Sequence, residues 1–591
     1  MSIINKSRKI ISKLTHRGLL VTLCSIGLTH APLQAESLVF HGGDILTMDS
    51  EYNPMPEAVL VENGVIKSIG ATADIMASKP ADTKVIDLNG RTLMPGFIAV
   101  HSHPNVKAAH YSFVDLSAYE NDSPEQVWEK LESAIKSAKK GEWVFAKGLD
   151  VLMMPELTAP SLEYMDKIAP DNPLYIFSQM LHSAWANSQA LQEMGITRDT
   201  PNPAADSYYE KDTHGNLTGY IHETAAIKPI GKWVLENIDI KENVVSALDD
   251  YPHSGVTTIS TLGLMDNDGK LMYLYDHLSS EKKSLDHSLL EFIGVLPKKK
   301  PTVRHFVYVT DEGQHLLPDS VDNGDDFFKV LGVKFWYDGS GSTGSMYNDA
   351  PYLVSHVTQN NFRIAPDYKG KNIYDEGELY NKIKPLHDAG WQLAVHAIGD
   401  RANKETIRDL ARVVNGAEKR DHRHRVEHVV LMPSAHIPPA ADAGLTFSFQ
   451  INYLYYYGSI LQDSVIGEPR TQAMLPIKST LDNGVRFTLH ADAPAFPGKP
   501  LSLVQAAVTR TSASGLLVGE NEAVPVWEAL KAVTINAAWQ LHMDENIGSI
   551  EEGKYADLVI LDKNPLKVAP NELRDIEIVK TYVHGNLLYQ Q

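Results

Sequence analysis

Short apolar runs bounded by turn residues alternate, through the middle of the chain, with stretches of helical periodicity. Eight of these runs have the length and β-branched content of buried strands. They span residues 97–101, 257–261, 289–295, 332–337, 392–396, 423–428, 446–450 and 486–492. Eight strands separated by helices predict an α/β fold, a parallel (β/α)8 TIM-like barrel, whose reactive residues lie at the carboxyl ends of the strands.

The gap between the first two runs is too long for a single helical connection. Residues 104–252 therefore form an insertion with its own elements, including a helix over 124–139 and a strand over 143–148. We expect the barrel with this insertion to occupy residues 94–545.

Both ends of the chain show a different pattern, in which short alternating strands are separated by turn signals. Residues 36–93 contain an Asn63-Gly64 hairpin turn between β-formers, and similar material returns only at 546–591. We interpret the two segments as one small β-sandwich built from both termini. Two separate β-modules are the alternative, but modules of about fifty residues are only marginally stable alone.

The first thirty-five residues predict a signal peptide. Five basic residues precede an apolar run over 18–28, and Leu33-Gln34-Ala35 ends in the small residue that export cleavage requires. We therefore expect an exported, periplasmic protein without stable membrane association after cleavage. An uncleaved anchor is disfavoured because so short an apolar run cannot cross a hydrocarbon core of about 30 Å.

Composition excludes several partners. The only cysteine, Cys24, lies in the predicted signal peptide, so the mature chain has no disulfide. Removing the five basic residues of that segment, which holds no acidic residue, changes the net charge from −20 to −25. So acidic a chain is not expected to bind nucleic acid or anionic lipid, and a small molecule is the expected partner.

Polar residues at the predicted strand ends carry the candidate chemistry. His101 and His103 end the first strand with one residue between them, so their imidazoles point to the same side. Two neutral imidazoles aimed at one point suit a divalent metal such as zinc. The other polar strand ends are Lys334, His396, His428 and Asp492. Any one of them alone fits a buried structural residue, whereas the joint pattern does not.

The motifs around these residues resemble the amidohydrolase superfamily, in the branch called YtcJ-like or amidohydrolase family 3. The resembling stretches are P-G-F-I-A-V-H-S-H at 95–103, H-S-A-W-A-N-S-Q-A-L at 182–191, V-K-F-W-Y-D-G-S at 333–340, A-V-H-A-I-G-D-R-A at 394–402, H-R-V-E-H at 424–428, H-A-D-A-P at 490–494, T-I-N-A-A-W at 534–539 and G-S-I-E-E-G-K-Y-A-D-L-V-I-L at 548–561. They follow the family's order and cover nearly the whole mature chain.

The resemblance implies a hydrolase with one or two divalent metal ions, zinc being the expected one. It implies that His101 and His103 bind the more buried ion, that His396 and His428 bind the more exposed one, and that Lys334 bridges them as a carbamate. Asp492 would touch a metal and act as the base. A metal lowers the pKa of water, which makes hydroxide accessible near neutral pH.

Two positions depart from the family's pattern. An acidic residue usually precedes the two histidines, whereas this chain has Ala99, so support for the metal ligands comes from elsewhere or is weaker. His490 stands where the family has a small residue, two before Asp492. We consider His490 a substrate or supporting group, with packing as the alternative, and His182 and Tyr337 are further candidates for binding the substrate.

These observations predict a metal-dependent hydrolase that cleaves a non-peptide carbon–nitrogen bond, in an amide or a cyclic amide. Hydrolysis of a lactone or other ester remains open, because the same nucleophile attacks either carbonyl. A non-catalytic binding protein with a degenerate site is the alternative from another class. The resemblance also allows a homodimer.

Overall fold

The computed structural model describes residues 37–49, 56–204, 207–237, 239–282 and 284–591. The predicted signal peptide at 1–35 therefore lies outside the described residues. All the elements below belong to one compact unit of the chain. None of the helices in the described segments is long and apolar enough to cross a membrane.

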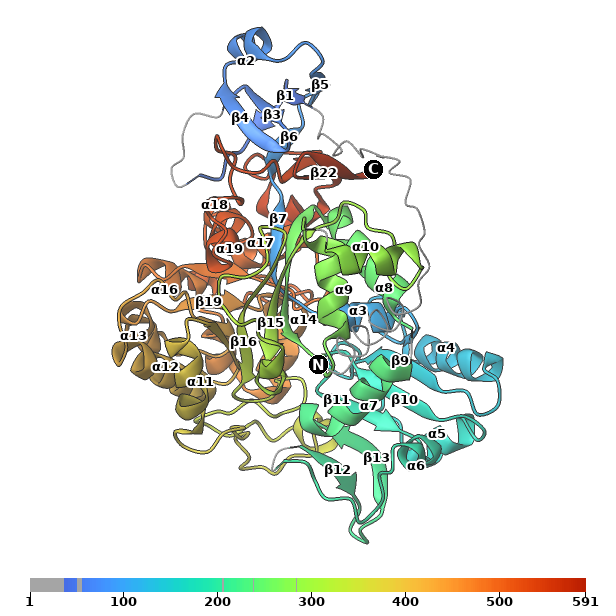
Figure 1. Ribbon diagram of the computed structural model, residues 1–591. Helices are drawn as coiled ribbons and strands as arrows, with labels where there is room; N and C mark the ends of the chain where they lie inside the picture. Colours follow the sequence, from blue (N-terminus) through green and yellow to red (C-terminus); the bar gives the residue numbers. More distant parts are fainter. Residues whose placement is uncertain (1–36, 50–55, 205–206, 238, 283) are drawn as a thin grey trace. The chain divides into compact units, whose positions relative to one another are not determined.

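The central sheet is the predicted eight-stranded parallel barrel (Figure 1). Its strands are β7 (Phe97–Ser102), β14 (Val256–Leu264), β15 (Arg304–Thr310), β16 (Phe328–Trp336), β17 (Gln392–Ala397), β18 (Arg425–His428), β19 (Thr446–Phe449) and β20 (Phe487–Leu489). Each strand pairs in parallel with the next in chain order. A parallel bridge between Ser102 and Ala493 joins the first strand end to the last. The predicted fold class is confirmed.

The third predicted strand, at 289–295, is wrong. Ser284 caps a helix there, α10 (Leu285–Phe292), and Gly294 follows it with φ +76°. Periodicity does not separate helix from strand in so short an apolar run. The third strand is β15, whose initial Arg304 breaks the apolar pattern but is buried in an ion pair with Asp557, 2.6 Å away.

Amphipathic helices cover the outside of the barrel. Those after β14 are α9 (Lys270–Ser279), α10, α11 (Glu378–Asp388), α12 (Asp400–Asn415), α13 (Ile437–Asp442), α14 (Asn452–Ile460), α15 (Glu468–Gln472), α16 (Ile477–Asp482), α17 (Pro500–Thr509), α18 (Val526–Lys531) and α19 (Ile535–Gln540). In α12 the buried Ala402, Thr406, Leu410 and Val413 recur at helical spacing. Burial of this stripe, rather than propensity, holds such a helix against its strands.

The insertion after β7 forms its own six-stranded sheet, in the order β12-β13-β11-β10-β9-β8. Its strands are β8 (Val114–Asp115), β9 (Val144–Leu149), β10 (Leu174–Ser178), β11 (Ser183–Ala186), β12 (Tyr208–Lys211) and β13 (Leu217–His222). Its helices are α3 (Pro104–His110), α4 (Pro124–Ser137), α5 (Leu162–Ile168), α6 (Ser188–Glu193), α7 (Thr224–Asn237) and α8 (Lys241–Asp249). The predicted helix and strand correspond to α4 and β9.

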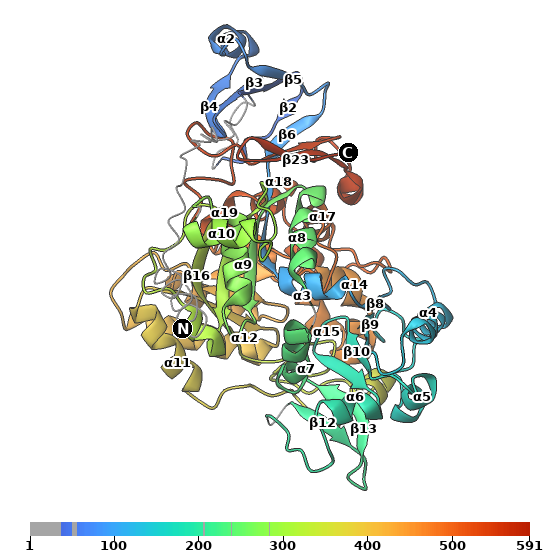
Figure 2. The same ribbon diagram turned by 45° about the vertical axis from the view of Figure 1, so that its right-hand side comes forward.

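Strands from both termini share one sheet, in which β6 from the N-terminal segment pairs with β21 from the C-terminal segment; Figure 2 labels β6 and β23 of this sheet. One sheet is β4-β3-β1-β5 and the other β2-β6-β21-β22-β23. The bounds are β1 (Leu38–His41), β2 (Asp44–Ile45), β3 (Ala58–Glu62), β4 (Val65–Gly70), β5 (Lys84–Asp87), β6 (Thr92–Pro95), β21 (Leu558–Leu561), β22 (Ile578–Val583) and β23 (Asn586–Gln590), with the helix α2 (Thr72–Ser78). Phe40 and Val59 share one buried cluster with Leu558 and Tyr582, so both termini contribute to one core.

Candidate active site and metal centre

The polar residues predicted from the strand ends come together in one pocket. His101, Lys334 and His396 lie near the carboxyl ends of β7, β16 and β17, and His428 is the last residue of β18. His103 follows β7 directly, and Asp492 lies three residues after the end of β20. All six line a pocket of about 670 Å³ that opens to solvent. Parallel strands place their carboxyl ends at one rim of a barrel, which is why residues so distant in sequence meet.

Three of these side chains converge without hydrogen bonding to one another. Asp492 Oδ1 lies 3.2 Å from His101 Nε2 and 3.0 Å from His103 Nε2. Oδ1 is buried, and among the described residues it has no hydrogen-bond partner. Ligand atoms held tetrahedrally around a zinc ion lie about 3.4 Å apart, given metal–nitrogen distances of about 2.1 Å. The three atoms thus have the spacing of a shared cation.

One ring nitrogen in each of three histidines donates a hydrogen bond to an acceptor. His101 Nδ1 donates to Glu427 at 2.7 Å, His396 Nε2 to the Gly339 carbonyl at 3.2 Å, and His428 Nδ1 to Gln450 Oε1 at 3.0 Å. A neutral imidazole whose one nitrogen carries the proton has its lone pair on the other. Each of these rings therefore carries its lone pair on the other nitrogen, which in His101 is Nε2, 3.2 Å from Asp492 Oδ1.

The Glu427 carboxylate takes the supporting role that the family's pattern gives to an acidic residue at the position of Ala99. Arg425 Nε and Nη2 hold it at 2.5 and 3.0 Å, and all of these groups are buried. Burial alone would raise the pKa of Glu427, but the charge of Arg425 and the His101 hydrogen bond hold that pKa well below its usual range. Support for the metal ligands thus comes from β18 rather than from the residue before the histidine pair.

Two candidate ligands have unusual backbone. His428 has φ +72° and Asp492 has φ +56°, in the left-handed region that residues other than glycine rarely adopt. Such conformations cost on the order of 1–3 kcal/mol each and concentrate at functional sites. The left-handed backbone at His428 breaks the side-chain alternation of β18. The side chains of Glu427 and His428, although adjacent, therefore both contact residues of the site.

Lys334 is buried, 1% exposed, beside the candidate ligands. Its ammonium lies 5.3 Å from the Trp336 ring centre. Burial lowers its pKa to about 8, against the opposing effect of Glu427 and Asp492. A lysine amine with so low a pKa is partly unprotonated near neutral pH, and only the unprotonated amine adds carbon dioxide.

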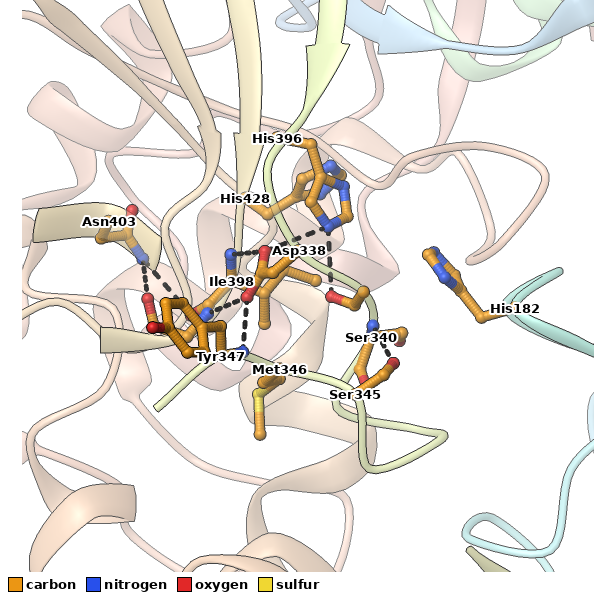
Figure 3. A network of polar contacts seen from close by, with 12 residues as sticks. His182, Asp338, Ser340, Ser345, Met346, Tyr347, His396, Ile398, Asn403 and His428 are labelled. Carbon is orange, nitrogen blue, oxygen red and sulfur yellow. Dashed lines mark hydrogen bonds and ion pairs between the residues drawn. The ribbon is translucent and has the colours of Figure 1, made fainter. Parts of the chain in front are cut away.

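The loop after β16 is fixed to the rim by one carboxylate (Figure 3). Asp338 accepts the backbone N–H groups of Tyr347, Ile398 and Gly399 at 2.9, 3.0 and 2.9 Å. Burial raises its pKa to about 7, although these hydrogen bonds lower it. This network sets the loop ends beside His396.

His182 enters the pocket from the insertion and faces the loop after β16 (Figure 3). Its Nδ1 lies 2.7 Å from Glu223 Oε2, and its ring centre lies 5.9 Å from that of His396. Glu223 Oε1 also accepts hydrogen bonds from Thr343 and Ser345. Burial lowers the pKa of His182, but Glu223 outweighs it and the net pKa is raised; in return His182 lowers the pKa of Glu223 to about 2.

Two predicted substrate residues do not line the pocket. Tyr337 is buried, and its hydroxyl donates to Glu405 of α12. Lys334 and Trp336 point to the pocket, so strand alternation turns the next residue outward. His490 lies among the metal-facing side chains, with its ring stacked on that of His101 at 4.3 Å between centres.

Sequence reasoning missed Glu427, Gln450 and Glu223. A signal existed for the first: Glu427 stands beside His428 and two residues after Arg425, on one strand. Glu223 follows β13 in the insertion and Gln450 follows β19. Their partners are distant in sequence, so only the folded chain reveals them.

The donor set fits a divalent metal. Imidazole nitrogens with a carboxylate oxygen are ligands that zinc and similar ions prefer. The groups whose ligand atoms lie within 4.8 Å of one another are His101, His103 and Asp492, and His101, His428 and His490. A parallel barrel with this set at its carboxyl rim defines a hydrolase of the metal-assisted class.

The chain belongs to the amidohydrolase family. The sequence profile described as "Amidohydrolase family" matches residues 84–589. The predicted family and the predicted enzyme class, an amidohydrolase acting on carbon–nitrogen bonds other than peptide bonds, are confirmed.

Two relatives match over nearly their whole length. An N-substituted formamide deformylase of Arthrobacter pascens is 27% identical, over 94% of this chain and 99% of the relative. The putative amidohydrolase YtcJ of Bacillus subtilis is 26% identical over the same shares. A crystal structure of an uncharacterized metal-dependent hydrolase from Pyrococcus horikoshii has a TM-score of 0.67 at 22% identity, covering 91% of this chain and 99% of that one.

Proposed function

We propose that this chain is a metal-dependent hydrolase of uncharged secondary amides, with N-substituted formamides as the first class to test. The observation that carries the metal dependence is the set of imidazole lone pairs that face the Asp492 carboxylate. The Arthrobacter pascens relative, an N-substituted formamide deformylase, supports the choice of substrate class.

His101, His103, His396, His428 and Asp492 would hold the metal, and Lys334, as a carbamate, would supply a further oxygen ligand. Zinc is the proposed ion. When bound, it would polarise the substrate carbonyl and make water a better acid. The low pKa of Lys334 and its burial among these groups support carbamate formation.

Proton transfer falls to two side chains of the pocket, Asp492 after β20 and His182 from the insertion. Asp492 would take a proton from the attacking water. Gln450 Nε2 lies 3.3 Å from Asp492 Oδ2 and orients that oxygen. His182, whose orientation Glu223 fixes, is placed to give a proton to the leaving nitrogen as the carbon–nitrogen bond breaks. The proton on Asp492 then passes through water to His182, and no covalent intermediate with the chain is needed.

The lining of the pocket favours an uncharged substrate with an apolar group. Apart from the residues already assigned, it consists mainly of apolar side chains. These are Val106, Met180, Leu181, Met265, Trp336, Ile398, Pro494 and Ala495. Among the described lining residues there is no arginine and no lysine besides Lys334, so a substrate carboxylate would find no dedicated partner.

The test is amine release from N-alkyl and N-aryl formamides, with acetamides, cyclic amides and lactones as comparison classes. We expect formamide hydrolysis that a chelator abolishes and added zinc restores. Faster hydrolysis of lactones than of amides would favour the alternative that the chain is a lactone or ester hydrolase. If metal binds but none of these classes reacts, the binding-protein alternative gains; hydrolysis that chelators leave intact would contradict the metal dependence.

We also propose that the chain is exported to the periplasm, cleaved after Ala35, and works on a small molecule without nucleic acid or a lasting membrane contact. The basic and apolar pattern at 6–28 and the mature charge of the chain support this. Mass spectrometry of the periplasmic protein tests the cleavage site, and sedimentation tests whether the chain forms the homodimer that the family resemblance allows.

A further inference from the structure

The short helix α10 on the outside of the barrel turns its apolar residues toward solvent (Figure 1, Figure 2). Leu285, Leu289 and Phe292 are 90%, 53% and 88% exposed, and Ile293, directly after the helix, is 58% exposed. His287 is the one buried residue of the helix. At about 100° per residue, the four apolar side chains share one side of the helix and His287 lies opposite. The helix is therefore amphipathic in the reverse of the usual sense, with its polar side inward.

The apolar face of α10 is not a scatter of single surface residues. Fifteen large apolar or tyrosine side chains are exposed in the described part of the chain, and five of them fall within residues 285–295. The fifth, Val295, is 47% exposed, while Leu285 and Phe292 are the two most exposed of the fifteen. Single exposed apolar residues are ordinary, but a contiguous group of this kind marks an interaction surface.

Contacts on the inner side fix the orientation of the helix. The His287 ring meets Tyr273 of α9 edge to face at 4.5 Å between centres, and His277 of α9 at 5.3 Å. Ser284 Oγ accepts the His287 N–H at 3.0 Å and so caps the amino end. The apolar face thus points outward because the polar side of the helix is the one packed on the barrel.

The size of the apolar face matches one half of a protein interface. A fully exposed residue of this size presents about 200 Å², so the five residues together expose on the order of 650 Å². A specific protein–protein interface buries about 800 Å² on each partner. The apolar face with the polar residues at its edge therefore suffices for a stable contact.

Charge distinguishes between a second copy of this chain and a lipid surface. The chain has a net charge of −20, which opposes approach to an anionic membrane. Close to α10, however, both signs are present: Asp286 is exposed near the amino end of the helix, and Lys298 is exposed after its carboxyl end. An antiparallel pair of α10 helices brings these opposite charges together and also sets the helix dipoles head to tail. The same surface is therefore complementary to itself.

We propose that a second copy of this chain binds to the apolar face of α10. The two helices pair antiparallel about a two-fold axis near Leu289, so that Leu285 of each copy packs against Phe292 of the other. Such an isologous contact closes the assembly at a dimer. The inference is independent of the proposed amide hydrolysis, since it concerns the outside of the barrel and not the pocket.

The experiment measures the mass of the mature protein by sedimentation over a range of micromolar concentrations. Leu285→Glu and Phe292→Lys each place a charge in the contact, and both positions are exposed, so neither variant should disturb the fold. Val354→Glu is the matched control, because Val354 is an apolar residue, 67% exposed, in the segment between β16 and α11. Circular dichroism checks that every variant is folded.

We expect wild type and Val354→Glu to be dimers, and Leu285→Glu and Phe292→Lys to dimerise at least about thirtyfold more weakly. Mixing the two variants should restore a dimer, because the antiparallel pairing places the new glutamate opposite the new lysine. A monomeric wild type, variants that dimerise as tightly as wild type, or a mixture that stays monomeric would each overturn the inference.

A second measurement distinguishes the lipid alternative. Wild type is sedimented with vesicles made of equal parts phosphatidylcholine and phosphatidylglycerol. We expect the protein to remain in the supernatant. Binding to the vesicles that Phe292→Glu abolishes would assign the apolar face to a membrane and overturn the inference of a second copy.

Discussion

Two clusters of buried histidines lie at opposite ends of β18. The cluster at the carboxyl end contains His101, His396 and His428, and the one before the amino end contains His387, His422 and His424. In both, ring centres lie as close as 4.3 Å. Burial and proximity therefore do not distinguish them.

Hydrogen bonds distinguish the two clusters. In the second, the Leu393 N–H donates to His424 Nδ1 at 3.1 Å, and His424 Nε2 lies 2.7 Å from His387 Nδ1. The His424 N–H donates to His422 Nδ1, whose ring donates in turn to the Ala443 carbonyl. In the cluster of His387, His422 and His424, N–H donors bind the imidazole lone pairs. In the cluster at the carboxyl end, acceptors bind the imidazole N–H groups and leave the lone pairs free. The direction of the lone pairs, not the number of histidines, marks a metal site.

The largest effect is expected at Asp492. Replacing it with asparagine removes the proposed base, so kcat should fall by about 10²–10⁴-fold in the amide assay. Asp482→Asn, on an exposed carboxylate that pairs with Lys478, is the matched control and should keep full activity. Wild-type turnover in folded Asp492→Asn would refute the proton-transfer role.

The next largest effect is expected at Glu427, whose carboxylate accepts hydrogen bonds from both His101 and Arg425. Glu427→Gln keeps an acceptor for His101 but leaves the buried Arg425 without a counter-charge, which costs about 3–5 kcal/mol. Metal affinity should fall about 10–100-fold as well. Thermal unfolding with and without metal, together with dye competition, measures both. A variant as stable and as metal-rich as wild type would show that Glu427 supports neither partner.

A smaller loss of activity is expected from substitutions at His182 and Glu223. His182→Asn and Glu223→Gln should each lower kcat about tenfold or more while metal content stays unchanged. Glu223→Asp, which retains a carboxylate, should recover part of the activity. The pH profile of kcat provides the check, because loss of a group that gives a proton moves its alkaline limb; an unchanged profile would leave His182 a purely structural residue.

The second cluster should affect stability alone. His424→Asn removes the partner of the Leu393 N–H and of His387, at a cost of about 1–3 kcal/mol. Urea unfolding should show this loss with no change in metal content or turnover. Loss of metal from this variant would mean that the two clusters are coupled.

The same cluster should contribute the smallest effect, a dependence of stability on acid. Burial lowers the pKa of His422 to about 4 and that of His424 well below its usual value. Their unfolded pKa is about 6.5, so the unfolded chain binds protons first as the pH falls. Their contribution is complete above about pH 6.5 and is lost on acidification toward pH 4. His422→Gln should flatten the slope of unfolding free energy against pH in that window, and an unchanged slope would contradict this.

Most of the barrel was predictable because its strands are continuous apolar runs that end in polar residues. His396 and His428 were identified this way, since a buried strand that ends in histidine is visible in one sequence. The strand at β15 was not, because Arg304 interrupts its pattern and is buried in an ion pair with Asp557, 253 residues away. Tyr337 has a different explanation, because alternation from Lys334, which the sequence already shows, turns its side chain away from the pocket toward α12.

The sequence by itself determined the fold class, the family and the six strand-end side chains, because these depend on local periodicity and on motifs of a few residues. Only the tertiary structure decided which nitrogen of His101, His396 and His428 donates a hydrogen bond, that Glu427 supports His101, that Glu223 orients His182, and that neither nitrogen of His490 has a hydrogen-bond partner among the described residues. Each of these is a contact or an absent contact between segments distant along the chain. Hydrogen-bond direction depends on such neighbours, and no local pattern of residues contains it.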